Sequence, residues 1–161
     1  MPITTLQDAI AAQAEVNRFL ASSGIKYLVG RYGELLIHKA LGGIRRNAVN
    51  RGFDIDHVEF QRIEVKTRQY ELMQDGTVRR ESRAVGFKGK ENGFDWLAHV
   101  VLDVDFTVLG ACVATYGDVW PEIERTTGKV GFPTSSRLPS SRDITQQVKK
   151  AQLELGFQTG S

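Results

Sequence analysis

Hydrophobic residues recur at helical spacing near the start of the chain. Leu6 and Ile10 begin an apolar stripe that runs through residues 4–23, and this period is typical of an amphipathic helix. Thr4 precedes the stripe, and Gln7 lies three residues after Thr4. This spacing is the arrangement of a reciprocal N-terminal cap. We therefore expect a first helix over 4–23 with Thr4 as its cap.

A second apolar stripe predicts a helix over 27–41. Leu28 and Leu35 lie on its apolar face, and a glycine pair follows its last apolar residue, where glycine commonly ends a helix. Gly30 and Gly33 fall inside the segment and have low helix propensity. The apolar spacing nevertheless favours a helix.

After this helix the pattern changes from helical to alternating. Phe53 and Ile55, then Ile63 and Val65, are apolar residues separated by single polar residues. This period of two predicts two strands that pair as a hairpin. An Asp-Gly pair at residues 75–76 indicates a second hairpin.

The second half of the chain supplies the expected centre of the sheet. Segments 96–103 and 106–115 are apolar and rich in β-branched residues, as strands buried on both faces are. Residues 118–125 are typical of a short helix with an acidic first turn. A Gly-, Pro- and Ser-rich stretch over 128–141 precedes a last helix capped by Asp143. The whole pattern predicts an α/β fold.

Length and composition are those of an ordinary globular domain. The chain has 161 residues, of which 41% are hydrophobic and 25% charged, so we expect a single domain over 1–161. No apolar run approaches the roughly 20 residues of a bilayer span, and the first residues lack the basic and apolar regions of a signal peptide. We expect a soluble, cytoplasmic protein with no membrane partner.

The formal net charge of +2 conceals an uneven distribution along the chain. Residues 1–90 carry +5, residues 91–128 carry −6 and residues 129–161 carry +3. Basic residues that cluster in one half suit an anionic partner such as nucleic acid, even when the total charge is small. Charge alone gives equal support to solvated charges on scattered faces.

Candidate chemistry is concentrated in the alternating segment. Residues two apart in a strand project from one face, about 6.6 Å apart, so Glu64 and Lys66 point away from the core together. Pairing with the preceding strand brings Asp54 or Asp56 beside Glu64. Two carboxylates in a cleft are hard oxygen ligands of the kind that Mg²⁺ prefers, with Mn²⁺ as a substitute. The peptide carbonyl of Val65 would add a further ligand.

A lysine beside such an ion suits phosphodiester hydrolysis. Lys66 would orient or help deprotonate a water and neutralise the charge that grows on a phosphoryl group. The Glu-Val-Lys tripeptide alone is more typical of a solvated strand edge. Its surroundings therefore decide the interpretation.

The order of these features resembles the PD-(D/E)xK nuclease superfamily, with its restriction-endonuclease-like or Holliday-junction-resolvase-like fold. The resemblance is carried by a helix bearing Glu34, a Gly-Phe-Asp run ending at Asp54, and an Ile-Glu-Val-Lys strand ten positions later. It covers about residues 27–116 and implies a mixed central sheet flanked by helices. The helix over 4–23 and a helical extension over 117–161 are additions to this core. Phe53 stands where the superfamily name has a proline.

The resemblance also assigns roles. Asp54 and Glu64 are the metal carboxylates, Lys66 orients the water, and Glu34 is an extra acid from the first core helix. Asp56 remains a rival ligand, with Asp54 favoured for its spacing to Glu64. His38, one helical turn after Glu34, either joins the site or forms a surface pair with it, the second being favoured.

The implied activity is a Mg²⁺-dependent endonuclease of bacterial or phage repair, restriction or defence, with DNA favoured as substrate. Cutting both strands with one active site per chain normally calls for a homodimer. We expect nucleic acid to be held through its phosphates by six basic residues: Arg45, Arg46, Arg51, Arg68, Lys88 and Lys90. The alternative is a non-catalytic nucleic-acid-binding or partner-docking module on the same fold.

Overall fold

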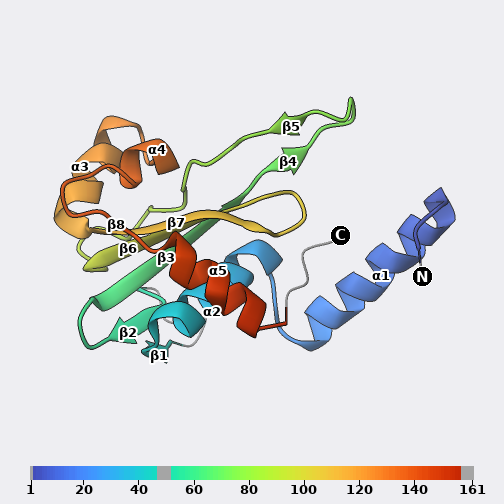
Figure 1. Cartoon of the computed structure of the whole chain (residues 1–161), viewed down its shortest axis with the longest axis horizontal. Helices are drawn as coiled ribbons and strands as arrows, with labels where there is room; N and C mark the ends of the chain where they lie inside the picture. The colour runs from blue at the N-terminus through green and yellow to red at the C-terminus, as the bar shows by residue number, and fades with distance from the viewer. Residues whose placement is uncertain (1, 47–51, 157–161) are drawn as a thin grey trace.

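A mixed six-stranded sheet with helices on both faces forms the body of the protein (Figure 1). The computed structural model describes residues 2–46 and 52–156. The strands lie in the order β1-β2-β3-β6-β7-β8, with the following bounds: β1 Ile44–Arg45, β2 Ile55–His57, β3 Gln61–Gln69, β6 Trp96–Leu102, β7 Val108–Thr115 and β8 Arg142–Asp143.

Strand pairing confirms the predicted hairpin and adds a parallel contact. β2 pairs antiparallel with β3, with Ile55 opposite Ile63, as the alternation predicted. β6 and β7 form a second antiparallel pair. β3 and β6 run parallel, with Ile63 opposite Trp96. The chain that leaves the end of β3 must therefore return to the level of its start before β6 begins.

One face of the sheet is covered by α2 (Leu28–Leu41) and α5 (Thr145–Glu154). The apolar residues of β3 and β6 on this face alternate with residues of the opposite face, as a strand requires. The buried residues at the centre of this layer include Leu36, Ile63, Val65, Val100 and Val148. The helix predicted over 27–41 is confirmed.

The opposite face carries a second, smaller core under α3 (Tyr116–Arg125) and α4 (Phe132–Ser135). Its buried residues include Phe87, Phe94, Leu97, Val119 and Ile123. Because Glu64 and Lys66 alternate with Ile63 and Val65, their side chains belong to this second face.

The C-terminal part is more regular than predicted. α3 begins two residues before the expected helix. α4 lies within the Gly-, Pro- and Ser-rich stretch over 128–141, and β8 (Arg142–Asp143) directly follows it. Asp143 does accept a hydrogen bond from the Thr145 amide at 2.8 Å, although the first helical turn is preceded by Ile144 in the cap position.

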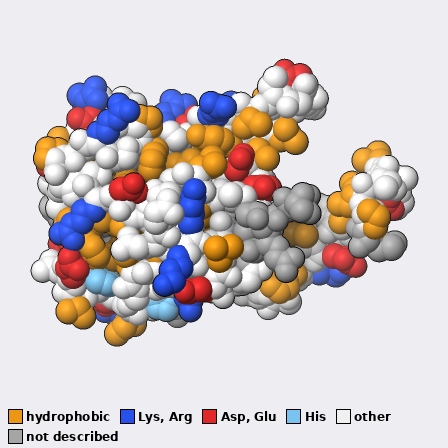
Figure 2. All heavy atoms as spheres, in the orientation of Figure 1, with side chains coloured by type: hydrophobic (Ala, Val, Ile, Leu, Met, Phe, Trp, Pro, Cys, Tyr) orange, Lys and Arg blue, Asp and Glu red, His pale blue; other side chains and the backbone are white. Residues whose placement is uncertain are grey.

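α1 (Leu6–Ser22) extends away from the sheet and contains no buried residue (Figures 1 and 2). Leu6 and Phe19 on this helix are 78% and 61% exposed. The predicted cap is one residue out of register: Thr5 and Asp8, rather than Thr4 and Gln7, form the capping box. Asp8 displaces Gln7 because its short carboxylate accepts from the Thr5 amide at 2.9 Å. Within residues 2–46 and 52–156, no helix combines the length and apolar character needed to cross a bilayer.

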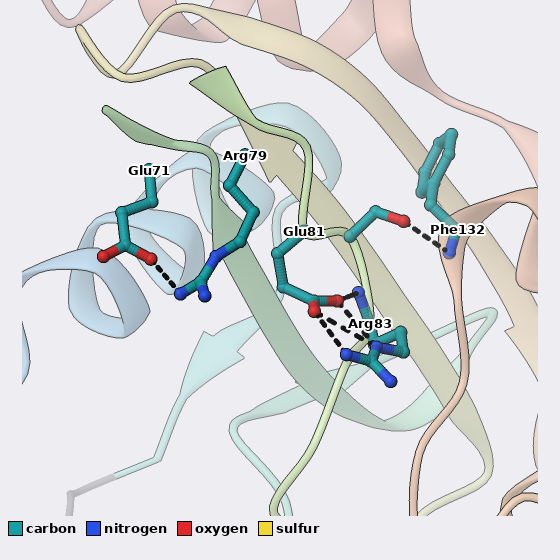
Figure 3. Close-up of polar contacts among 6 residues, drawn as sticks. Glu71, Arg79, Glu81, Arg83 and Phe132 are labelled. Atoms are coloured by element: carbon teal, nitrogen blue, oxygen red, sulfur yellow. Dashed lines mark hydrogen bonds and ion pairs between the residues drawn. The ribbon is translucent and has the colours of Figure 1, made fainter. Parts of the chain in front are cut away.

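The Asp-Gly turn forms the predicted second hairpin, β4 (Glu71–Leu72) with β5 (Val78–Arg79), which extends from the body. Arg79 forms an ion pair with Glu71 across the hairpin, and Arg83 binds Glu81 just after it (Figure 3). These two arginines are therefore already paired with carboxylates.

Gly33 is required where α2 crosses β3. A Cβ at Gly33 would lie 1.7 Å from Oγ1 and 2.8 Å from Cβ of Thr67. At Gly30, three residues earlier on the same helix, a Cβ would meet no atom within 4 Å. Gly33 has low helix propensity, but its lack of a side chain is what lets α2 approach β3 closely.

We predict opposite effects of alanine at these two glycines. Gly33→Ala should destabilise the protein by about 2 kcal/mol or more because α2 must move off β3. Gly30→Ala should stabilise it by roughly 0.5–1 kcal/mol through helix propensity alone. Urea unfolding followed by circular dichroism measures both changes. Equal effects of the two substitutions would contradict the close packing at Gly33.

Candidate functional site

The pairing of β2 with β3 brings Asp54 beside Glu64. Ile55 lies opposite Ile63, and the Asp54 amide donates to the Ile63 carbonyl at 2.9 Å. Asp54 Oδ2 in turn accepts from the Val65 amide at 2.7 Å. The carboxylate of Asp54 is therefore held against the Glu-Val-Lys segment by the backbone itself.

Glu64 is a buried carboxylate with a lysine on each oxygen. Its side chain is 2% exposed. Lys66 Nζ lies 2.9 Å from Oε1, and Lys90 Nζ lies 3.0 Å from Oε2. A buried charge is tolerated only when it is paired and hydrogen-bonded. Both lysines consequently supply the partners that the buried carboxylate of Glu64 requires.

The two lysines tie the site to the loop that precedes β6. Lys66 Nζ donates to the Gly86 carbonyl at 3.1 Å and lies 5.3 Å from the centre of the Phe87 ring. Lys90 Nζ lies 3.4 Å from the Gly52 carbonyl oxygen. The site is thus bounded by β2, β3 and the loop over 86–93.

The pKa of Asp54 is raised from its ordinary value of 3.8 to about 7. Burial is the main cause, because it disfavours the charged carboxylate, and the nearby charge of Glu64 adds to it. The charge of Glu34 acts in the same direction, whereas the Val65 amide and Lys90 lower the pKa. An acid that titrates near neutral pH inside a polar cluster is typical of functional sites.

Glu34 reaches this site through its charge. It lies on α2, where Arg31 Nη1 contacts its Oε2 at 3.1 Å and Arg45 Nη2 lies 3.8 Å from the same oxygen. Its negative charge adds to the causes that raise the pKa of Asp54. The structure therefore places Asp54, Glu64 and Lys66 together, whereas the contacts of Glu34 are with Arg31 and Arg45.

The two rival residues have other partners. Asp56 lies opposite Arg62 in the β2–β3 pair, further from Glu64 than Asp54, and it forms an ion pair with Arg46. His38 Nε2 lies 3.0 Å from the Gly43 carbonyl oxygen, one turn from Glu34. The geometry supports the choice of Asp54 as the carboxylate beside Glu64.

The basic residues expected to contact phosphates differ in whether they are already paired with a carboxylate. Arg45, Arg46 and Lys90 are paired with carboxylates, as described above. Lys88 is exposed and makes no ion pair with any residue of 2–46 or 52–156. Nε of Arg68 is buried without a hydrogen-bond partner in that part of the chain. Arg51 lies outside the described residues.

The donor set suits a hard divalent cation. In the described part of the chain, no group of three or more His, Cys, Asp and Glu side chains is arranged to hold a metal ion. The predicted set is smaller, with two carboxylates, Asp54 and Glu64, and the Val65 carbonyl. Asp54 Oδ1 makes no hydrogen bond to the described residues, while its Oδ2 is held by the Val65 amide. These oxygen donors fit Mg²⁺ or Mn²⁺, which retain water ligands.

Two features of the site were not predicted. Lys90 was expected on a nucleic-acid surface, yet it lies on the buried carboxylate. Arg62 donates two hydrogen bonds to the Asp95 carboxylate, from Nε to Oδ2 at 2.8 Å and from Nη2 to Oδ1 at 3.0 Å. This ion pair joins the start of β3 to the residue before β6. Both contacts depend on the parallel pairing of β3 with β6, which no local pattern indicates. The only local signal for the Lys90 contact was the presence of lysines in the glycine-rich segment 86–93.

The raised pKa of Asp54 predicts a pH-dependent stability. Because its pKa is higher in the folded protein than the ordinary value of 3.8, folded Asp54 binds a proton more tightly. The favourable contribution of Asp54 to the free energy of unfolding is fully present below about pH 4 and is lost as the pH rises through about 7. We therefore compare the free energy of unfolding of Asp54→Asn with that of the wild type. The difference, variant minus wild type, should be larger at about pH 8 than at about pH 5 by on the order of 1–3 kcal/mol.

Urea unfolding of both proteins at the two pH values measures this difference. Subtracting the wild-type change from the variant's change removes the contribution of all other titrating groups. Parallel pH dependence of the two proteins would contradict the raised pKa.

Comparison with known proteins adds no relative: no protein-family model matches the chain, and no curated protein matches its sequence.

Proposed function

We propose that the chain is a metal-dependent endonuclease of the PD-(D/E)xK type that hydrolyses phosphodiester bonds of DNA. The observation that carries this proposal is the cluster of Asp54, Glu64 and Lys66 on one face of the sheet, with Lys66 Nζ 2.9 Å from the Glu64 carboxylate. The mixed sheet with helices on both faces supports the restriction-endonuclease-like fold.

Each residue of the cluster has a chemical role in this proposal. Asp54, Glu64 and the Val65 carbonyl would hold Mg²⁺, which supplies a polarised water and stabilises charge on the phosphoryl oxygens. The Lys66 ammonium orients the attacking water and offsets the negative charge that develops during in-line displacement. Glu34, on α2, would raise the proton affinity of Asp54 through its charge.

The pairing of most basic residues with carboxylates limits the surface that is free to bind phosphates. Lys88 is exposed on the loop beside the site and is the natural first contact for a phosphate. Arg45 and Arg46 would exchange their carboxylate partners for phosphates as the substrate binds. Binding should accordingly weaken with salt.

One observation favours the second candidate, a non-catalytic module that binds nucleic acid or docks a partner. The two lysines on Glu64 neutralise this carboxylate without any ion, so the cluster is also a stable structural unit. Such a module would keep the fold and would need neither metal binding nor Asp54.

A nuclease assay tests the proposed activity. Purified protein with Mg²⁺ should cleave linear, nicked, branched or single-stranded DNA, and EDTA should abolish cleavage. Lys66→Met should reduce the rate by at least about 100-fold because it removes the ammonium and preserves the length of the side chain. Lys149→Met, a change at an exposed position of α5 on the opposite face, serves as the matched control. Cleavage that persists in Lys66→Met would indicate contamination and contradict the proposal.

Calorimetry with Mn²⁺ separates the two candidates. We expect binding to the wild type, loss of that binding in Asp54→Asn, and retention in Asp56→Asn, whose carboxylate pairs with Arg46. RNA in place of DNA in the cleavage assay identifies the preferred nucleic acid. A wild-type protein that binds nucleic acid but neither binds Mn²⁺ nor cleaves would establish the docking module instead.

A further inference from the structure

The segment over 86–93 forms a strap across the site, held at both ends by the second core. Phe87, near the start of the strap, and Phe94, the residue directly after it, are 3% and 1% exposed and anchor it on the two sides. Between them the strap is turned by internal hydrogen bonds, from the Lys90 amide to the Phe87 carbonyl at 3.0 Å and from the Gly93 amide to the Lys90 carbonyl at 2.9 Å. The rest of the strap, apart from Lys90 and Gly93, is exposed.

Lys90 is the strap residue that points into the site. Its Nζ lies 3.0 Å from Glu64 Oε2 and 3.4 Å from the Gly52 carbonyl oxygen, and its side chain is 18% exposed. These contacts are a carboxylate oxygen and a peptide oxygen around one positive charge. Hard divalent cations take the same kinds of oxygen.

The position of Lys90 conflicts with a divalent cation on Glu64. With Lys66 on Oε1 and Lys90 on Oε2, the carboxylate already has two positive charges within 3.0 Å. A cation shared between Asp54 and Glu64 would bring two further positive charges into the same partly desolvated space. Like charges at such distances repel strongly when water is excluded.

The two lysines differ in their freedom to leave. Lys66 belongs to β3, whose backbone is paired with β2 on one side and β6 on the other. Lys90 belongs to the strap, in which Gly89 has a φ of +76° and the backbone carries no strand pairing. Movement of the strap costs far fewer backbone hydrogen bonds than movement of β3.

We propose that Lys90 is a resident cation that occupies the place of a divalent ion on Glu64, and that binding of the ion displaces Lys90 and releases the strap. This inference depends on the proposed metal-dependent function. Displacement would couple the arrival of the ion to exposure of the site, since the strap crosses it. The freed ammonium, together with Lys88, would then be available to phosphates of the substrate.

Calorimetry with Mn²⁺ at constant pH and ionic strength tests the competition. Lys90→Met removes the ammonium and preserves the length of the side chain, so it should bind Mn²⁺ at least about tenfold more tightly than the wild type. Lys88→Met, on the same strap but without contact to Glu64, should bind Mn²⁺ as the wild type does. Equal or weaker binding by Lys90→Met than by the wild type would overturn the displacement.

Hydrogen exchange of the wild type provides a second measurement that needs no variant to fold. Saturating Mn²⁺ should accelerate amide exchange at Lys90 and Gly93, whose amides donate within the strap, and should leave the amides of β7 unchanged. Unchanged or slower exchange in the strap would overturn the proposal. If Mn²⁺ binds but the strap is not released, the displacement of Lys90 is contradicted and the proposed nuclease function is not. If neither the wild type nor Lys90→Met binds Mn²⁺, the proposed function is contradicted as well.

Discussion

The buried carboxylate of Glu64 is the constraint on which the site depends. A carboxylate that is 2% exposed needs hydrogen-bonding cations around it. One of them, Lys66, comes from the same strand two residues later. The other, Lys90, comes from the strap before β6 and reaches Glu64 because β6 runs parallel to β3 and begins beside its start. The need to pair one charge therefore connects the sheet topology with the course of the strap.

The same burial explains why the acids of the site behave differently. Glu64 has an ammonium on each oxygen, whereas Asp54 has a peptide amide on one oxygen and acidic neighbours in Glu64 and Glu34. Desolvation then raises the pKa of Asp54 to about 7. Near neutral pH the Asp54 carboxyl group thus gains or loses its proton. A divalent cation would favour the ionised form of Asp54.

The sequence predicted what local backbone geometry determines. The period of two identified the β2–β3 hairpin and the shared face of Glu64 and Lys66, and the helical period identified α2, because both periods follow from the position of Cβ in the backbone. The contact of Lys90 with Glu64 was not predicted, because it spans 26 residues and depends on a parallel pairing. The shift of the α1 cap to Thr5 reflects a choice between adjacent residues that periodicity does not resolve.

Internal pairing also changes what the basic residues mean for a nucleic-acid partner. The excess of Lys and Arg in residues 1–90 suggested a surface for phosphates, but Arg45, Arg46 and Lys90 each contact a carboxylate of the site or its surroundings. A phosphate that binds these residues must replace an existing partner, and only the difference between the two interactions contributes to affinity. Lys88 has no such competitor within the described residues. In the proposed nuclease, initial attraction would therefore fall to the strap. The paired arginines would contribute later, when the substrate is close enough to exchange with their carboxylates.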